Sequence, residues 1–384
     1  MSESAPLVIV GSGHAGYTLA REFRKLDEQR PLLIISADDG ASYYKPNLSK
    51  ALAMGKSATD LIQFSAQQMA ESLNAEVLCD TEVTAINAQQ QRLSAGERQI
   101  DYSQLVLATG AQPIRLPLHG NAADAVLSIN NHQHYAAFRQ RLQAGSRVLL
   151  IGAGLIGCEF ANDLAAQGYA VTAVDLAESP LPQLLPAACG TALQHGLAGL
   201  GVDWRLGQSV TAVEHDKSAL RAVFADGSSG EYDLVLSAVG LRPDLRLAKS
   251  AGLDSDHGII VDKQLRSSDP NIYALGDCIQ IDGRLLPFIL PIAHGARALA
   301  KTLSGEPSDA LMPAMPVMVK TPACPVLVCP PPPHADGGWT VSGQAPGLCA
   351  EFKGADDQLL GFALLGEQTK RRGEFAKLVP AVIG

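Results

Sequence analysis

The feature that most constrains the fold is a short apolar run followed by a glycine-rich turn. Leu7–Val10 has the composition of a buried strand, and Gly11-Ser12-Gly13-His14-Ala15-Gly16 follows it with the spacing G-x-G-x-x-G. A helical pattern then continues through Lys25. In such a turn the first glycine permits the bend, the second admits a pyrophosphate, and the third lets helix and strand pack closely. The stretch predicts a dinucleotide-binding unit, with a glycine turn that binds nothing as the alternative.

A second glycine turn repeats the pattern in the middle of the chain. Arg147–Ile151 reads as a strand, Gly152-Ala153-Gly154-Leu155-Ile156-Gly157 as the turn, and a further strand, Ala170–Val174, ends in Asp175. An acid at this spacing accepts hydrogen bonds from both ribose hydroxyls and repels a 2′-phosphate. Because no Arg or Lys lies between Asp175 and Pro186, we predict NADH rather than NADPH here. An ordinary strand-end carboxylate is the alternative for Asp175.

The first unit lacks a carboxylate at the equivalent strand end. Its second strand, Pro31–Ile35, is followed by Ser36 and Ala37, and the first acid is Asp38. Asp38 is therefore the candidate for the ribose contact of this unit.

Two further strands end in small residues, as a backbone that passes close to a ligand requires. Leu105–Gly110 follows the first glycine turn, and Leu234–Gly240 follows the second. Each turn thus has its own downstream strand, and two nucleotide units are the simplest arrangement. The segment Asn271–Cys278 and a helical run over Ile292–Leu303 come next.

The composition and pattern of the sequence change at Met312. Prolines stand at 313, 316, 322, 325 and 330–333, and alternating short strands follow. This pattern predicts a small separate domain. The alternative for the proline run is a linker with no fold of its own.

Composition excludes several classes of protein. Lys+Arg 30 against Asp+Glu 39 gives a net charge of −9, which argues against general affinity for nucleic acid or anionic membranes. No apolar run reaches the ~18 residues of a membrane span, and residues 1–6 lack a signal-peptide pattern. We expect a cytoplasmic protein without a membrane span. The seven cysteines are odd in number and form no metal-binding or disulfide framework.

These segments together resemble the pyridine-nucleotide flavoprotein reductases of the glutathione-reductase structural class. The resemblance rests on Val8–Gly16, Ala108–Gly110, Val148–Glu159, Ser237–Gly240 and Ile272–Asp277, in the order that the class uses. It implies an α/β fold with two Rossmann-like nucleotide-binding domains and a small C-terminal α+β domain. It also implies that FAD binds at the first glycine turn and NADH at the second. Asp277 would then contact the ribityl–pyrophosphate region of FAD.

The same resemblance suggests a division of the chain into domains. We expect residues 1–112 and 241–313 to form a discontinuous FAD-binding domain around the NAD-binding domain of residues 113–240. Residues 314–384 would form the small C-terminal domain.

Cysteines that the class uses in redox catalysis are missing. Disulfide reductases of this class carry a C-x₄-C just after the first nucleotide unit. Coenzyme A-disulfide reductases and NADH peroxidases carry a single cysteine in the stretch that matches Ser42–Pro46. Neither cysteine occurs here. The resemblance therefore implies that the flavin passes electrons directly to an acceptor.

Three segments are similar to one branch, the NADH:rubredoxin reductases of pseudomonad type. Ser42–Lys50 resembles the Y-x-R-P-x-L-S-K segment of ferredoxin and rubredoxin reductases, with Lys45 in place of Arg, and Pro46 argues against a helix through Lys45. Residues 156–164 and 315–325 carry the rest of the similarity. It implies electron transfer from NADH through FAD to rubredoxin. The alternatives are a reductase of flavorubredoxin or of a [2Fe–2S] ferredoxin, and an NADH-sensing flavoprotein of apoptosis-inducing-factor type.

The resemblance also implies roles for individual side chains. Glu159 would face the flavin and pair with Lys45, and Lys320 would stabilise the reduced flavin, with a solvated lysine as its alternative. Cys158 and Cys278 are interpreted as buried packing thiols. No catalytic residue is named, because hydride transfer between two cofactors needs no general acid or base.

The candidate cofactor-binding residues fall on both glycine turns, the strand ends and the three family-like segments. They are Gly11, Ser12, Gly13, His14, Ala15, Gly16, Ser36, Ala37, Asp38, Lys45, Val83, Ala108, Thr109, Gly110, Gly152, Gly154, Leu155, Ile156, Gly157, Glu159, Asp175, Gly240, Gly276, Asp277 and Lys320.

Overall fold

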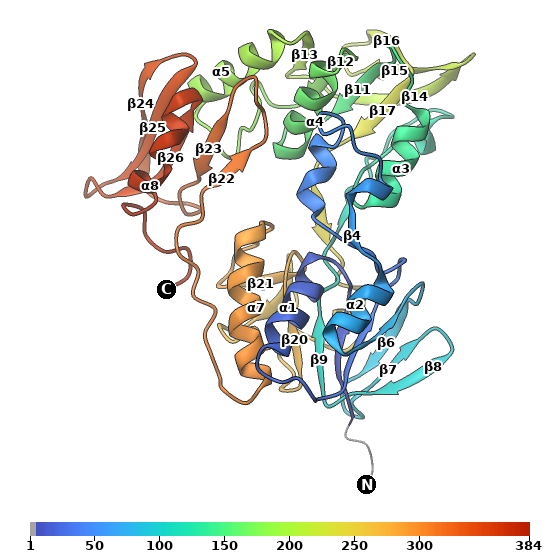
Figure 1. The fold of residues 1–384 in the computed structure, drawn as a ribbon. Coiled ribbons are helices and arrows are strands. Elements are labelled where there is room, and N and C mark those ends of the chain that lie inside the picture. The colour runs from blue at the N-terminus through green and yellow to red at the C-terminus, as the bar shows by residue number, and fades with distance from the viewer. Residues whose placement is uncertain (1–4) are drawn as a thin grey trace.

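The first nucleotide unit is built on a five-stranded parallel sheet, shown in the lower part of the molecule in Figure 1. The structure is a computed structural model that describes residues 5–384. The sheet has the order β20-β9-β1-β2-β5, with β1 at its centre and fully buried, as its apolar run predicts. Helices α1 and α7 pack against each other. The main elements are β1 Leu7–Val10, α1 His14–Arg24, β2 Leu32–Ile35, α2 Ala66–Leu73, β5 Glu76–Leu78, β9 Gln104–Leu107, β20 Ile272–Ala274 and α7 Ile289–Leu303.

Shorter elements complete this unit. A three-stranded antiparallel meander, β6-β7-β8, lies between β5 and β9 in the chain, and the unit has two further small sheets, β3-β4 and β19-β21. The bounds are β3 Ser42–Tyr43, η1 Lys45–Lys50, η2 Thr59–Leu61, β4 Ile62–Phe64, β6 Val83–Asn87, β7 Arg92–Ala95, β8 Arg98–Asp101, α6 Arg246–Ser250, β19 Ile259–Val261 and β21 Ile279–Ile281.

The second nucleotide unit repeats the plan in the upper part of Figure 1. Its parallel sheet has the order β13-β12-β11-β17, and a meander, β14-β15-β16, follows β13 in the chain. The chain crosses between the units twice, and the two crossings pair with each other as the antiparallel strands β10 and β18. The bounds are β10 Ala111–Pro113, η3 Ala123–Ala125, α3 His132–Arg141, β11 Arg147–Ile151, α4 Leu155–Ala166, β12 Ala170–Asp175, α5 Ala187–Ala198, β13 Val202–Leu206, β14 Val210–Asp216, β15 Ala219–Phe224, β16 Ser229–Tyr232, β17 Leu234–Ser237 and β18 Leu241–Pro243.

The C-terminal part is an antiparallel sheet of order β22-β23-β26-β25-β24. The proline run at 330–333 joins β23 to β24 of this one sheet, so the interpretation of that run as a linker is wrong. Val319 and Val326 of the sheet pack in the same hydrophobic cluster as Leu150 of β11. The bounds are β22 Val317–Val319, β23 Val326–Cys329, β24 Gly337–Gln344, β25 Gly347–Gly354, β26 Leu359–Leu365, η4 Gly366–Arg371 and α8 Arg372–Phe375.

The predicted fold class is confirmed, with two boundaries moved. The helix expected over Ile292–Leu303 starts three residues earlier, at Ile289, and Pro291 lies in its first turn, where a missing N–H costs no helical hydrogen bond. The second nucleotide helix starts at Leu155, inside its G-x-G-x-x-G turn rather than after it. Within residues 5–384, no helix has both the length and the apolar surface that crossing a membrane demands.

Candidate functional site

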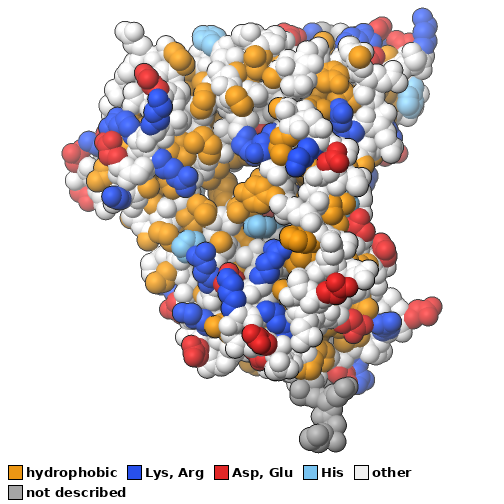
Figure 2. Space-filling view, in the orientation of Figure 1, with side chains coloured by type: hydrophobic (Ala, Val, Ile, Leu, Met, Phe, Trp, Pro, Cys, Tyr) orange, Lys and Arg blue, Asp and Glu red, His pale blue; other side chains and the backbone are white. Residues whose placement is uncertain are grey.

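A cavity of about 1850 Å³ lies between the two nucleotide units and the C-terminal sheet. In Figure 2 the surface is hollowed near the centre of the molecule, and hydrophobic and basic side chains gather at this hollow. Pockets for a single small molecule usually measure about 300–1,000 Å³. The cavity is therefore large enough for two dinucleotides.

All but three of the candidate residues line this cavity. The three exceptions are Gly16, Gly157 and Gly276, which are not among its lining residues. The lining candidates are Gly11, Ser12, Gly13, His14, Ala15, Ser36, Ala37, Asp38, Lys45, Val83, Ala108, Thr109, Gly110, Gly152, Gly154, Leu155, Ile156, Glu159, Asp175, Gly240, Asp277 and Lys320.

The glycines of the first turn differ in what surrounds them. Gly11 has a φ of +115°, which an L side chain rarely adopts. A Cβ at Gly16 would overlap the carbonyl oxygen of Gly11, so this glycine lets the helix approach the strand. A Cβ at Gly13, by contrast, would meet no protein atom within 4 Å. The open space at Gly13 faces the cavity, at the N-terminus of α1, where an anion is favoured.

The second turn has the same three environments. Gly152 has a φ of +108°, and a Cβ at Gly157 would overlap the carbonyl oxygen of Gly152. A Cβ at Gly154 would meet no protein atom within 4 Å, and this glycine is the N-cap of α4. Both turns therefore combine close packing at the third glycine with free space at the second.

The strand-end acids make defined hydrogen bonds. In the first unit the Ser36 hydroxyl donates to Asp38 Oδ1 at 2.5 Å and lies 2.6 Å from the Ser12 hydroxyl. Ser36 thus connects the glycine turn to the displaced carboxylate. In the second unit Asp175 accepts hydrogen bonds from the Ala153 N–H at 2.6 Å and the Ala177 N–H at 2.8 Å. Both carboxylates are held at the cavity wall beside their glycine turns.

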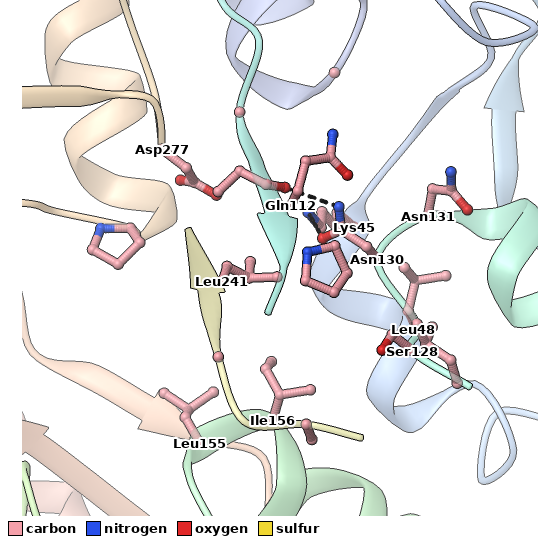
Figure 3. Close-up of a pocket in the computed structure, with 18 of the residues that line it drawn as sticks. Lys45, Leu48, Gln112, Ser128, Asn130, Asn131, Leu155, Ile156, Leu241 and Asp277 are labelled. Carbon is pink, nitrogen blue, oxygen red and sulfur yellow. Dashed lines mark hydrogen bonds between the residues drawn. The ribbon is translucent and has the colours of Figure 1, made fainter. Parts of the chain in front are cut away.

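The pair expected between Glu159 and Lys45 is wrong. The ammonium group of Lys45 donates to Asn130 Oδ1 at 2.7 Å instead, as Figure 3 shows. Burial lowers the pKa of Lys45, and the charge of Asp277 partly opposes this effect. Burial also raises the pKa of the Asp277 carboxyl, which Lys45 partly opposes. Lys45 therefore faces Asp277 and the segment before α3.

Glu159 is fully buried and pairs with Lys320. Its Oε2 atom lies 2.5 Å from the Lys320 ammonium and accepts a hydrogen bond from the Ser49 hydroxyl at 2.5 Å. Its Oε1 atom accepts the Lys320 backbone N–H at 2.9 Å. All three partners of the Glu159 carboxylate are hydrogen-bond donors, and none of them is Lys45. One helix, α4, thereby connects η1 of the first unit to the end of β22.

The segment after β3 differs from the expectation at Pro46. A 3₁₀ helix begins at Lys45 and places Pro46 in its first turn, where its missing N–H leaves no bond broken. Asp163, one turn along α4 from Glu159, accepts the backbone N–H groups of Leu52 and Ala53 at 3.0 and 2.9 Å. These contacts hold the residues that follow η1 against the second unit.

Sequence reasoning missed Asn130 and Ser49. Both line the cavity and contact a charged candidate residue, but each reaches its partner from a different part of the chain. The only local signal at Asn130 is its place just before Asn131, whose side chain caps α3 by accepting the His134 N–H at 2.7 Å.

The described cysteines lie away from the cavity wall. Cys158 and Cys278 are fully buried, as interpreted, and burial raises the pKa of each thiol. Among residues 5–384, all seven cysteines are free and none lines the cavity.

Comparison with known proteins identifies the family. Residues 5–300 match the family model described as pyridine nucleotide-disulphide oxidoreductase, and residues 310–379 match the rubredoxin binding C-terminal domain. The chain is 45% identical over 379 residues to a rubredoxin-NAD(+) reductase of Alcanivorax borkumensis, covering 98% of this chain and 99% of that one. It is 40% identical over 366 residues to a nitric oxide reductase FlRd-NAD(+) reductase of Aeromonas hydrophila, covering 95% and 94%.

A solved structure has the same fold over nearly the whole chain. The covalent putidaredoxin reductase–putidaredoxin complex superposes with a TM-score of 0.88 at 26% identity, covering 98% of this chain and 94% of that one. Both glycine turns, their strand-end acids and the small-residue strands lie within the matched residues. The chain therefore belongs to the pyridine nucleotide-disulphide oxidoreductase family.

Proposed function

We propose that this chain is an NADH-dependent FAD flavoprotein that reduces rubredoxin. The observation that carries the proposal is the match of residues 310–379 to a rubredoxin binding domain, next to a cavity lined by two dinucleotide turns. A bound FAD would supply the chemistry that this reaction needs, namely acceptance of a hydride from NADH and release of single electrons to the iron centre of the carrier. No described cysteine lines the cavity, which supports direct transfer without a thiol relay.

The residues of the first unit fit FAD. Gly13 leaves space at a helix N-terminus for the pyrophosphate. Asp38 would accept hydrogen bonds from the adenosine ribose, and its three hydrogen bonds from Ser12, Ser36 and Gly40 all fall on Oδ1, which leaves Oδ2 for the ligand. Asp277 and Lys45, which both line the cavity, would contact the ribityl–pyrophosphate region.

The residues of the second unit fit NADH. Gly154 provides the same open space at the start of α4, and Asp175 provides the ribose acceptor. Glu159 lies one turn into the same helix and fixes the Lys320 ammonium at the cavity. Lys320 would there stabilise negative charge that develops on the reduced cofactor.

We expect the variant Asp175→Ala to raise the KM for NADH by about tenfold, because one charge-assisted ribose contact is lost. The maximal rate at saturating NADH should change little. Steady-state kinetics with a dye acceptor measures both values. Asp38→Ala, at the equivalent place in the first unit, is the matched control and should weaken FAD binding instead. An unchanged KM in Asp175→Ala would remove this residue from the NADH site.

The carrier is tested with purified acceptors. We expect the flavin-loaded protein to reduce rubredoxin with NADH at least about tenfold faster, in kcat/KM, than it reduces a [2Fe–2S] ferredoxin. The reason is that residues 310–379 match a domain that binds rubredoxin. Equal rates for both carriers would contradict the assignment to rubredoxin. If NADH reduces the flavin but no carrier is reduced, a signalling flavoprotein of apoptosis-inducing-factor type becomes the better explanation. A colourless preparation that does not take up FAD would exclude the flavin itself.

Flavorubredoxin is a second candidate acceptor. The relative from Aeromonas hydrophila, with FlRd in its name, is 40% identical to this chain. Including flavorubredoxin in the same assay separates the two candidates by their kcat/KM values.

The domain division and the compartment belong to the same proposal. Residues 1–112 and 241–313 would bind FAD, residues 113–240 NADH, and residues 314–384 the carrier. The free thiols of the described chain suit a reducing compartment, and we propose that the protein acts in the cytoplasm.

A further inference from the structure

Lys45 is a basic side chain of the first unit that lines the proposed FAD site. It starts η1 and is partly buried at the cavity wall. An ammonium group on a four-carbon stem is mobile, and its charge serves an anionic ligand only if the group is held in place. Asn130 Oδ1, at 2.7 Å, is the acceptor that holds it.

The orientation of the Asn130 amide is determined by a second contact. Its Nδ2 group donates to the carbonyl oxygen of Ala111 at 3.0 Å. Since the nitrogen end is engaged there, the oxygen end must face Lys45. Ala111 begins β10, where the chain leaves the first unit, and Asn130 lies in the loop before α3 of the second. The amide therefore joins the crossing strand, the second unit and the lysine.

The acceptor of the Lys45 hydrogen bond, the Asn130 amide oxygen, is neutral. Lys45 therefore keeps its positive charge for a ligand. The charged and titratable groups that face Lys45 are Asp277 across the cavity and His134 on α3. No carboxylate lies within 4 Å of its ammonium group in the described chain. A carboxylate in contact would cancel the positive charge, whereas an amide oxygen accepts the hydrogen bond and leaves the charge intact.

We infer that Asn130 is a positioning residue, which holds the Lys45 ammonium group at the cavity wall as an uncancelled positive charge for the pyrophosphate of FAD. The inference rests on the proposed FAD site of the first unit. It adds to that site a residue from the second unit, so the two units bind the flavin together.

A pair of neighbouring substitutions tests the charge argument. Asn130→Asp and Asn131→Asp add the same charge at adjacent residues that both line the cavity. In Figure 3 Asn131 points away from Lys45, and aspartate caps a helix as well as asparagine does. Flavin is removed from the full-length variants, and FAD is titrated back by fluorescence. We expect Asn130→Asp to raise the dissociation constant of FAD about tenfold and Asn131→Asp to change it less than about twofold.

The pH dependence of FAD binding gives a readout that a structural defect would not move. Lys45 is charged below its pKa, so FAD binding should weaken as the pH rises through that value. A carboxylate at residue 130 stabilises the ammonium and should move this alkaline limb to higher pH, while a carboxylate at residue 131 should leave it in place. Equal effects of the two aspartates on affinity and on the limb would overturn the inference.

A double-mutant cycle removes any general effect of the Asn130 change. We expect Asn130→Ala to weaken FAD binding about threefold to fivefold in the natural background and not at all in a Lys45→Met background. Additive effects would show that Asn130 acts without Lys45, which overturns the inference and leaves the FAD site standing. An unchanged FAD affinity in Lys45→Met alone would remove Lys45 from the proposed site, and the inference with it.

Discussion

The variant Gly16→Ala is expected to lose its flavin and to unfold at least about 2 kcal/mol more easily than the natural chain. A Cβ at this position overlaps the carbonyl oxygen of Gly11 and lies 3.4 Å from the Ile9 side chain. The overlap is with backbone, so no change of rotamer relieves it, and α1 must move away from β1. Overpacking of this kind costs about 3 kcal/mol, more than the roughly 1 kcal/mol that alanine gains over glycine in a helix.

Thermal or urea unfolding and the flavin absorbance of the purified variant measure this effect. Gly13→Ala is the matched control from the same turn, because a Cβ there meets no protein atom within 4 Å. It should keep the stability of the natural apoprotein and weaken only FAD binding. Gly157→Ala introduces the same clash in the second turn and should impair NADH binding more than FAD binding. If Gly16→Ala retains normal stability and flavin, the close approach of α1 to β1 is not required.

The variant Glu159→Gln is expected to lower stability by about 2–4 kcal/mol and to slow flavin reduction by NADH at least about tenfold. The Glu159 carboxylate accepts hydrogen bonds from Ser49, from the Lys320 backbone and from its ammonium group, and all three are donors. A glutamine amide would turn its own N–H₂ group toward one of them. Breaking a buried pair costs about 3–5 kcal/mol, and the lower figure reflects the partial exposure of Lys320.

Urea unfolding and stopped-flow reduction with NADH separate the two effects. Asp163→Asn removes a buried carboxylate from the next turn of α4, which bonds backbone N–H groups and does not line the cavity. It should lower stability but leave the rate of flavin reduction unchanged. Adding Lys320→Met to Glu159→Gln should recover part of the stability, because no unpaired ammonium group remains. A normal reduction rate in Glu159→Gln would confine the pair to a structural role.

The two nucleotide units were predictable because their signals are local. Each glycine turn packs its third glycine against its own first glycine, within six residues of chain. The apolar runs at Leu7–Val10 and Arg147–Ile151 similarly become the buried central strands that their composition indicates. Physical demands that act within one βαβ unit leave a pattern that a single sequence displays.

The partners of the charged side chains were not predictable in the same way. Lys45 contacts Asn130 and Glu159 contacts Lys320, and each pair joins segments that meet only after both units have folded. Any buried acid and any lysine satisfy the same chemistry, so the family pattern suggested Glu159 with Lys45. In the folded chain α4 instead places the Glu159 carboxylate against Lys320, the residue that follows β22. Neutral partners such as Asn130 leave no signal of charge at all.

The Pro46 segment and the proline run at 330–333 show a different limit. Proline excludes conformations, but it does not choose among those that remain. At Pro46 the chain starts a short helix, and at 330–333 it makes a loop within one sheet. Both outcomes depend on the surrounding packing.

The strand order of the first sheet has a consequence for the time course of folding. Strand β20 pairs with β9 through Ile272 and Leu105, and the entire second unit lies between them in the chain. During synthesis the second unit therefore emerges complete before the first sheet can close at that edge. Closure of so long a loop costs conformational entropy that a folded, compact insert reduces by bringing its two ends together at β10 and β18. The second unit can thus fold as a compact insert before β20 completes the first sheet.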